Sequence, residues 1–346
     1  EAVVAAVNKA GGDMSMKDLN DYKMIIQEPV MGTYRGYSIY STPPASSGGT
    51  HIVQLLNIME NFPVAQWKHN SPEYLHYLAE AMKMVFADRQ RYMADTAFVD
   101  VPLAGLASKE YAKQLAEKIT RYNVMQEVLP GDPWQFDGGK KTAYIGHDGN
   151  KHISTSSFSV VDSDGNIVAS TNTVNYFFGS GVIVPEYGFV LNNEMDDFAQ
   201  DPASVNAPEP GKRPLSSMSP TIVLDPEGRP FMSLGSAGAM RIITAMSQII
   251  MNVVDFGMTM DEAIEQPRIF NVASSGKAGK LLVEGGIDPA TVMYLQFRGH
   301  NIDERARGGY FGTAQGILIN YAKGMHQHGR INGGADSRRL GVPVGF

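Results

Sequence analysis

The sequence contains no cysteine, which excludes disulfide bonds, thiolate metal ligands and a cysteine nucleophile. It also lacks an excess of basic residues, since 29 Lys and Arg stand against 36 Asp and Glu and the net charge is -7 at pH 7. This balance does not favour binding to nucleic acid or to anionic lipid. The longest apolar run, residues 242–254, is interrupted by polar side chains and is too short to span a bilayer. It predicts a buried helix.

The sequence also has few histidines that lie close enough together to bind a metal ion. The 8 histidines are dispersed, and the closest pair is His326 and His328. A metal site requires a third ligand at a suitable spacing, so a surface loop is the favoured interpretation of this pair. We predict no metal and no cofactor.

What the sequence does contain is enough apolar material for a large core, because 43% of its 346 residues are hydrophobic. Residues 1–12 are typical of the end of a helix that is stopped by glycine. Further on, residues 34–44 alternate like a strand, and Ser71 precedes a helix predicted over 72–93. From residue 155 onward strands predominate; they are predicted at 155–161, 167–174, 182–191, 219–224, 230–235, 281–284 and 314–321. The pattern favours an α+β fold with a largely antiparallel sheet.

Ser and Thr are unusually dense in residues 152–175, where DSDG (162–165) separates two alternating runs. Gly165 can adopt the left-handed conformation that closes a three-residue loop with a bulge. This loop pairs residue 162 with 166 and places Thr155 opposite Thr173, whereas a two-residue loop would pair Thr155 with Val174. A cross-strand threonine pair is common in sheets, so by itself it does not indicate catalysis.

Four segments accompany this hairpin at fixed distances: TNTVNYFFGSG (171–181), LNNEMDDF (191–198), GKRPLSSMSPT (211–221) and LGSAGAMRIIT (234–244). Together with TSSFSVVDSDG from residue 155 they resemble the gamma-glutamyltranspeptidases, which are N-terminal-nucleophile hydrolases. The resemblance extends to residues 34–62, to ADRQRYMAD (87–95) and to GGADSRRLG (333–341), and therefore covers nearly the whole chain. It implies a four-layer αββα sandwich.

The resemblance also implies that the precursor cuts itself between Ser154 and Thr155. The Thr155 hydroxyl would attack the carbonyl of Ser154, and water would hydrolyse the resulting ester. Residues 1–154 would then form the C-terminal part of a large subunit, and 155–346 a small subunit that stays associated with it in one domain. Cleavage frees the α-amine of Thr155, whose pKa near 8 suits a general base for the neighbouring hydroxyl.

Further roles follow from the same resemblance. Thr173 would hydrogen-bond the nucleophile, and the backbone N–H groups of Gly238 and Ala239 would form an oxyanion hole. The family commonly has Pro-Gly-Gly where this chain has Ala237-Gly238-Ala239, and alanine takes a positive φ less readily than glycine. The residues expected to bind the α-amino and α-carboxyl groups of a gamma-glutamyl substrate are Asn175, Glu194, Asp197, Ser216 and Ser217.

Two further features distinguish this chain from the family pattern. The arginine that grips the substrate α-carboxylate lies in the N-terminal part of the family's large subunit, ahead of the first residue here, so no residue is assigned that role. Residues 198–215 are shorter than the loop that closes over the substrate in some members, contain four prolines and have no tyrosine. They predict an open pocket that admits water and bulky gamma-glutamyl chains.

We therefore expect a gamma-glutamyl hydrolase or transferase that acts on glutathione-like or poly-gamma-glutamyl substrates. By family resemblance it would be periplasmic or extracellular. The alternatives are another N-terminal-nucleophile amidase, such as a cephalosporin-acylase-like enzyme, or an unprocessed or inactive binding homologue. The acidic residues at 194 and 197 favour an amino-acid-like substrate over the acylase alternative.

Overall fold

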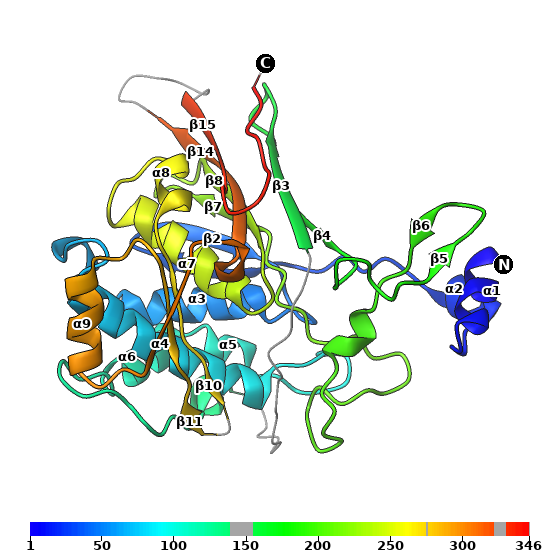
Figure 1. Ribbon diagram of the computed structural model, residues 1–346, viewed down its shortest axis with the longest axis horizontal. Helices are drawn as coiled ribbons and strands as arrows, with labels where there is room; N and C mark the ends of the chain where they lie inside the picture. The colour runs from blue at the N-terminus through cyan, green and yellow to red at the C-terminus, as the bar shows by residue number, and fades with distance from the viewer. Residues whose placement is uncertain (139–154, 275, 322–329, 346) are drawn as a thin grey trace.

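The computed structural model describes residues 1–138, 155–274, 276–321 and 330–345 (Figure 1). Ser154, His326 and His328 lie outside these ranges. The α-helices are α1 (Ala2–Lys9), α2 (Met16–Asp21), α3 (Gly48–Met59), α4 (Pro72–Tyr92), α5 (Leu103–Leu106), α6 (Lys109–Ala116), α7 (Arg241–Val254), α8 (Met260–Glu265) and α9 (Pro289–Phe297). Short 3-10 helices are η1 (Val64–Gln66), η2 (Pro133–Phe136), η3 (Glu194–Asp197) and η4 (Gly309–Phe311).

The largest sheet has six strands in the order β1-β2-β7-β8-β14-β15, and all of its neighbouring strands are antiparallel. Its strands are β1 (Val30–Tyr34), β2 (Tyr37–Ser41), β7 (Thr221–Leu224), β8 (Pro230–Ala237), β14 (Thr313–Asn320) and β15 (Arg330–Ala335). Two of these strands precede residue 155 and four follow it. Segments on both sides of that residue therefore build one sheet, joined where β2 pairs with β7.

Smaller sheets lie around it. The hairpins are β3 (Thr155–Val161) with β4 (Ile167–Thr173), β5 (Ile183–Val184) with β6 (Phe189–Val190), and β10 (Ala273–Ser274) with β11 (Lys277–Ala278). A three-stranded sheet has the order β13-β12-β9, from β9 (Ile269–Phe270), β12 (Leu281–Glu284) and β13 (Ile302–Arg305). Figure 1 shows α1 and α2 beside the β5–β6 hairpin, away from the six-stranded sheet.

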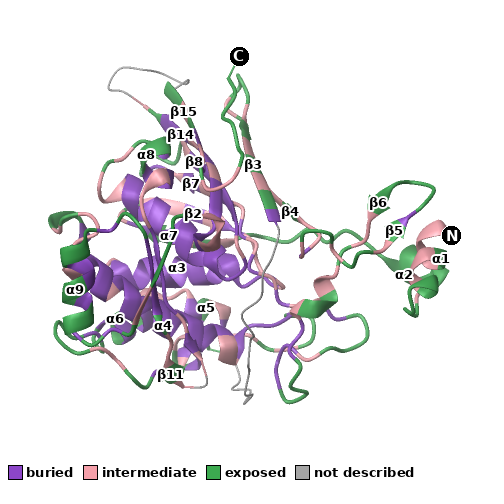
Figure 2. Cartoon of the chain, viewed as in Figure 1, coloured by how far each residue is buried: buried purple, intermediate pink, exposed green. Residues whose placement is uncertain are grey.

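Helices α3, α7 and α8 pack against the six-stranded sheet, and α4 packs against α3. Every residue of α3 is buried, and Figure 2 shows that α3, α4 and α7 form the most deeply buried part of the molecule. Helix α4 begins as predicted, because the Ser71 side chain accepts a hydrogen bond from the backbone N–H of Tyr74 and Pro72 occupies the first turn. Within the described ranges, no helix combines the length and the apolarity needed to cross a bilayer.

The β3–β4 hairpin packs against β8, on the other side of the sheet from α7 (Figure 1). Close approach is possible because Gly235 has no side chain: a Cβ there would lie 2.7 Å from Cβ of Ser157. The Ser233 hydroxyl also donates to Oγ of Ser159 over 2.8 Å. The outer face of the hairpin carries exposed apolar side chains, among them Phe158 and Val160. Exposed apolar side chains gathered on one face are typical of a surface that packs against another layer of structure.

Two strand predictions are wrong in detail. Residues 182–191 form the short β5–β6 hairpin and not one strand, because the chain turns back where the Gly188 N–H bonds to the carbonyl of Val184. Residues 34–44 contain the end of β1, the turn at Arg35 and Gly36, and β2, with both turn residues at positive φ. In each case the structure has two antiparallel strands joined by a turn, where the alternation of apolar and polar residues predicted one strand.

Candidate active site

The hairpin brings Thr155 and Thr173 together. Gly165 has a φ of +83°, and the N–H of Asp162 donates to the carbonyl of Asn166 over 3.1 Å, so the loop is the predicted three-residue form. Thr155 pairs with Thr173, which confirms the register expected from the turn. The two Oγ1 atoms are 3.2 Å apart and share a hydrogen bond. Thr155 is buried, with 6% of its surface exposed.

The oxygen of Thr173 is held in place from its other side by Asn175. The backbone N–H of Asn175 donates to Oγ1 of Thr173 over 2.8 Å. Asn175 itself is buried with a φ of +72°, a conformation that asparagine tolerates better than most residues. Its amide Nδ2 donates to the carbonyl of Asn193 and, over 3.4 Å, to Oδ1 of Asp197. One asparagine thus links the threonine pair to the acidic segment.

A cavity of about 440 Å³ opens beside the threonine pair. Its walls include nearly all of the residues predicted from the sequence: Thr155, Thr173, Asn175, Glu194, Asp197, Ser216, Ser217 and Ala239. Gly238 directly precedes Ala239 in the same turn. Segments more than eighty residues apart in the sequence therefore meet in one pocket, as a substrate-binding site requires.

The acidic part of this cavity comes from η3. Burial raises the pKa of the Glu194 carboxyl to about 7, and the neighbouring negative charge of Asp197 adds to this rise. Among the residues that the structure describes, the buried Oε1 of Glu194 has no hydrogen-bond partner, so a bound donor would satisfy it. Asp196 instead accepts a hydrogen bond from the Tyr176 hydroxyl over 2.6 Å. Two adjacent acids facing a cavity suit an ammonium group.

The two serines are positioned by the start of α3. Ser47 donates from its backbone N–H and from its hydroxyl to the carbonyl of Ser216, each over 2.9 Å. Gly48 allows the two segments to approach, because a Cβ there would lie 2.6 Å from the carbonyl oxygen of Ser217. The glycine-rich start of α3 thus holds the double-serine segment against the cavity.

The turn between β8 and α7 adopts an unusual backbone conformation. Gly238 has a φ of +138°, and a Cβ there would lie 2.8 Å from Cα of Gly312. Ala239 has a φ of +56°, which costs an alanine about 1–2 kcal/mol. Ala239, which stands where the family commonly has the second glycine, therefore still takes the left-handed conformation. The turn leads directly into Arg241, the first residue of α7, where helix N–H groups favour negative charge.

Comparison with known proteins identifies the family. The profile of the family described as Gamma-glutamyltranspeptidase matches residues 1–346. The chain is 36% identical over 342 residues to the glutathione hydrolase proenzyme of Bacillus subtilis and 37% identical over 352 residues to that of Escherichia coli, and each match covers 98% of this chain. The chain belongs to the gamma-glutamyltranspeptidase family. It spans 56% of the length of each of these two relatives.

A solved structure supports the fold of this family member. The cephalosporin acylase from Bacillus halodurans is 27% identical and superposes with a TM-score of 0.81, covering 100% of this chain and 58% of the acylase chain. The predicted α+β fold of the N-terminal-nucleophile hydrolases is confirmed.

Two arginines of this family member, Arg339 and Arg89, lie at the site although the sequence predicted no role for them. Arg339 donates from Nη1 to the carbonyl of Thr155 over 3.3 Å. Arg89 lies in the cavity wall. A signal for Arg89 exists in the sequence, since it continues the helical spacing of buried Met82 and Phe86. A charged residue in such an apolar stripe is buried only where it finds partners.

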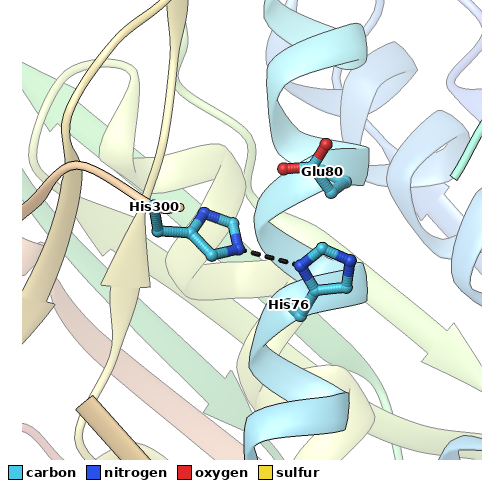
Figure 3. A group of neighbouring side chains, drawn as sticks. All are labelled: His76, Glu80 and His300. Carbon is cyan, nitrogen blue, oxygen red and sulfur yellow. Dashed lines mark hydrogen bonds between the residues drawn. The ribbon is translucent and has the colours of Figure 1, made fainter. Parts of the chain in front are cut away.

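A second cluster of buried ionisable residues lies away from this site. His76 and Glu80 rise from α4 toward His300, as Figure 3 shows, and their ligand atoms all lie within 4.8 Å of one another. His76 Nε2 bonds to the carbonyl of Thr120 over 2.8 Å and must therefore carry a proton, so Nδ1 accepts from Nε2 of His300, also over 2.8 Å. Both carboxylate oxygens of Glu80 are engaged, one by Lys83. These hydrogen bonds account for the cluster, and we assign it a structural role.

The histidine pair predicts a loss of stability in mild acid. Burial lowers the pKa of His76 to about 4 and, together with His76, that of His300 to about 3. The unfolded chain, in which histidine titrates near pH 6.5, binds more protons than the folded one below that pH. The contribution of the two histidines to the free energy of unfolding is thus fully present above about pH 6.5 and is lost as the pH is lowered toward 4. We expect His300→Gln, which keeps a donor for His76 but does not titrate, to flatten this fall.

The measurement is the melting temperature of the wild type and of His300→Gln from pH 7.5 to pH 4. Between pH 7.5 and pH 4 the melting temperature of the wild type should fall by at least ~5 °C more than that of His300→Gln. Parallel curves for the two proteins would contradict the assigned role.

Proposed function

We propose that this protein is a gamma-glutamyl hydrolase or transferase that forms an acyl ester on Thr155. The observation that carries the proposal is the Thr155–Thr173 hydroxyl pair, 3.2 Å apart, in the wall of a cavity that also contains Glu194 and Asp197. A nucleophile, a hydroxyl partner for it and a binding site for an ammonium group are thus found in one pocket.

The first step is self-cleavage. The Thr155 hydroxyl adds to the carbonyl carbon of Ser154, the C–N bond breaks, and the chain is transferred from nitrogen to oxygen as an ester. Water then hydrolyses the ester, which leaves a carboxylate on Ser154 and a free amine on Thr155. The two parts, 1–154 and 155–346, stay associated because β2 and β7 pair in one sheet.

In the processed protein the α-amine of Thr155 takes the proton of its own hydroxyl, which attacks the gamma-carbonyl of the substrate. In the structure the Thr155 hydroxyl donates to Oγ1 of Thr173, which also accepts from the Asn175 N–H. Once the Thr155 hydroxyl has given its proton to the amine, the Thr173 hydroxyl would donate to the attacking oxygen and stabilise its developing charge. Backbone N–H groups at Gly238 and Ala239 would stabilise the oxyanion. The leaving amine takes the proton, and water or a second amine releases the acyl group.

The substrate would be an amino acid linked through its gamma-carboxyl group, as in glutathione-like or poly-gamma-glutamyl compounds. Glu194 and Asp197 offer negative charge for its α-ammonium, and Ser216 and Ser217 offer hydroxyls for its α-carboxylate. Relatives of this chain are named glutathione hydrolase proenzymes, which agrees with this chemistry. Family resemblance further suggests a periplasmic or extracellular location.

A cephalosporin-acylase-like activity is the second candidate, since a solved relative carries that name. The buried Oε1 atom of Glu194, which has no hydrogen-bond partner among the described residues, argues against it, because a substrate without an ammonium group leaves that oxygen without a partner. An unprocessed or non-catalytic homologue would instead keep the peptide bond before Thr155 intact.

The deciding experiment combines intact mass measurement, N-terminal sequencing and turnover of a gamma-glutamyl anilide and a glutaryl amide. We expect two pieces, the second beginning at Thr155, and release of the anilide. An intact chain that still turns over the anilide would refute the mechanism. Cleavage with turnover of the glutaryl amide alone would favour the acylase candidate.

Residues 198–215 lead to a prediction on the fate of the acyl ester. The segment lines the cavity at Phe198, and Asn206 ties it down by donating to the carbonyl of Asp197 over 2.8 Å and accepting from the N–H of Leu215 over 3.0 Å. A second cavity of about 950 Å³ adjoins it at Phe198. A segment tied at both ends beside a wide cavity leaves room for water and for long substrates.

We therefore expect hydrolysis to compete well with transfer, and poly-gamma-glutamate to be attacked. The products of anilide turnover should be measured with and without glycylglycine, and polymer length should be followed separately. Predominant transfer at low acceptor concentration, with an intact polymer, would show that the site closes.

A further inference from the structure

Arg89 places a positive charge in the wall of the cavity. It lies in the last turns of α4, is only 4% exposed, and shares the cavity with Thr155 and the double-serine segment. An arginine guanidinium carries a positive charge in proteins. A ligand that binds in this cavity therefore meets the positive charge of Arg89 in its wall.

The hydrogen bonds of Arg89 lead to the two serines that the substrate carboxylate is proposed to contact. Nη2 donates to Oγ of Ser217 over 3.2 Å, and Nε donates to Oγ of Ser47 over 2.8 Å. Ser47 in turn donates to the carbonyl of Ser216. One guanidinium thus reaches both members of the double-serine segment, one directly and one through Ser47.

These contacts determine what the Ser217 hydroxyl can do. Because its oxygen accepts a hydrogen bond from Arg89, its own proton is directed away from the guanidinium. Ser217 also lines the cavity, so an anionic group there can accept that proton. A donor polarised by a neighbouring cation binds a carboxylate more strongly than an isolated hydroxyl does.

We propose that Arg89 determines specificity for the α-carboxylate of the substrate, by orienting and polarising Ser217 and by contributing positive charge to the cavity wall. The proposal rests on the proposed gamma-glutamyl function and names a residue of this chain that provides charge opposite in sign to Glu194 and Asp197. It is a positioning residue, because its hydrogen bonds act through serine hydroxyls.

Arginine suits this position better than lysine would. Its rigid fork donates from Nε and Nη2 in two directions at once, to Ser47 and Ser217, whereas an ammonium group on a flexible chain does not hold two segments in one geometry. Replacement by lysine keeps the charge and loses the fork. Replacement by glutamine loses the charge while retaining a polar side chain.

A purely structural brace between α4 and the serine segment is the competing explanation. Loss of a brace would weaken the binding of every ligand to a similar extent, because the whole cavity wall would move. Loss of a carboxylate determinant would weaken only ligands that carry the α-carboxylate. Three competitive inhibitors distinguish the two: L-glutamate, 4-aminobutanoate, which lacks the α-carboxylate, and glutarate, which lacks the α-ammonium.

The experiment measures inhibition constants of these three compounds against a gamma-glutamyl anilide, for the processed wild type, Arg89→Gln and Arg89→Lys. Arg91→Gln is the matched control, since Arg91 lies on the same helix and does not line the cavity. We expect Arg89→Gln to weaken L-glutamate and glutarate by ~10- to 100-fold and 4-aminobutanoate by less than ~2-fold. Arg89→Lys should show the same selectivity with a smaller loss, and Arg91→Gln should match the wild type.

An equal loss for all three inhibitors, or no loss for L-glutamate, would overturn the proposal. If Arg89→Gln does not fold or process, the ratio of the L-glutamate and 4-aminobutanoate constants in Arg89→Lys decides the question. If the wild type does not turn over the anilide, the proposed function fails independently. Calorimetric titration with L-glutamate then still tests whether Arg89 recognises the carboxylate.

Discussion

Replacing Thr155 by alanine is expected to leave the chain uncut and to lower turnover of a gamma-glutamyl anilide by at least ~10³-fold. Alanine has no hydroxyl to attack the preceding carbonyl, so neither the ester nor the free α-amine can form. The fold should persist, because Thr155 is the first residue of β3 and, among the described residues, its side chain loses the hydrogen bond to Thr173. Intact mass, a denaturing gel and initial rates measure the effect.

Two variants make this result specific. Thr155→Ser keeps the hydroxyl but loses the branch that limits its rotamers, so it should process and react more slowly than the wild type. Ser156→Ala removes the next hydroxyl along the strand, which is exposed, and should behave like the wild type. A cut and active Thr155→Ala protein would mean that another residue is the nucleophile.

Asp197→Asn is expected to lower kcat/KM for the anilide by ~100-fold while self-cleavage continues, because it removes one of the two negative charges proposed to hold the substrate ammonium. Asparagine has the same size and can still contact Asn175. The matched control is Asp196→Asn, since Asp196 bonds to the Tyr176 hydroxyl and does not line the 440 Å³ cavity. A variant that neither folds nor processes would assign Asp197 to the scaffold.

The same variant should change the pH dependence of substrate affinity. The pKa of Glu194 is raised to about 7 by burial and by the charge of Asp197, so this carboxyl becomes ionised only as the pH rises through neutrality. An ionised carboxylate attracts the ammonium, and affinity in the wild type should therefore rise with pH through this region. Removing the charge of Asp197 should move that rise to lower pH. If the midpoint of the rise in affinity with pH stays the same in Asp197→Asn, ionisation of Glu194 does not control that rise.

Local patterns in the sequence were sufficient for the hairpin that carries the proposed nucleophile. Gly165 occupies the position that needs a positive φ, and the two-residue period of the strands then sets every pair along them, including Thr155 with Thr173. The start of α4 was equally predictable, because Ser71 and Pro72 form an N-terminal signal within a few residues. Alternation failed for residues 182–191, where the tight turn at Gly188 leaves strands too short to show a period.

The sequence by itself therefore determined the threonine pair, the segments that resemble the family and the α+β class, since these depend on turn residues and periodicity over short stretches. Only the tertiary structure decided that Arg89 contacts Ser217 and that Arg339 reaches the Thr155 carbonyl. The partners in these contacts are 128 and 184 residues apart. Such contacts follow from how α3, α4 and the sheet pack around one core, and packing between distant segments leaves no local signal in the sequence from which a hydrogen-bond partner can be read.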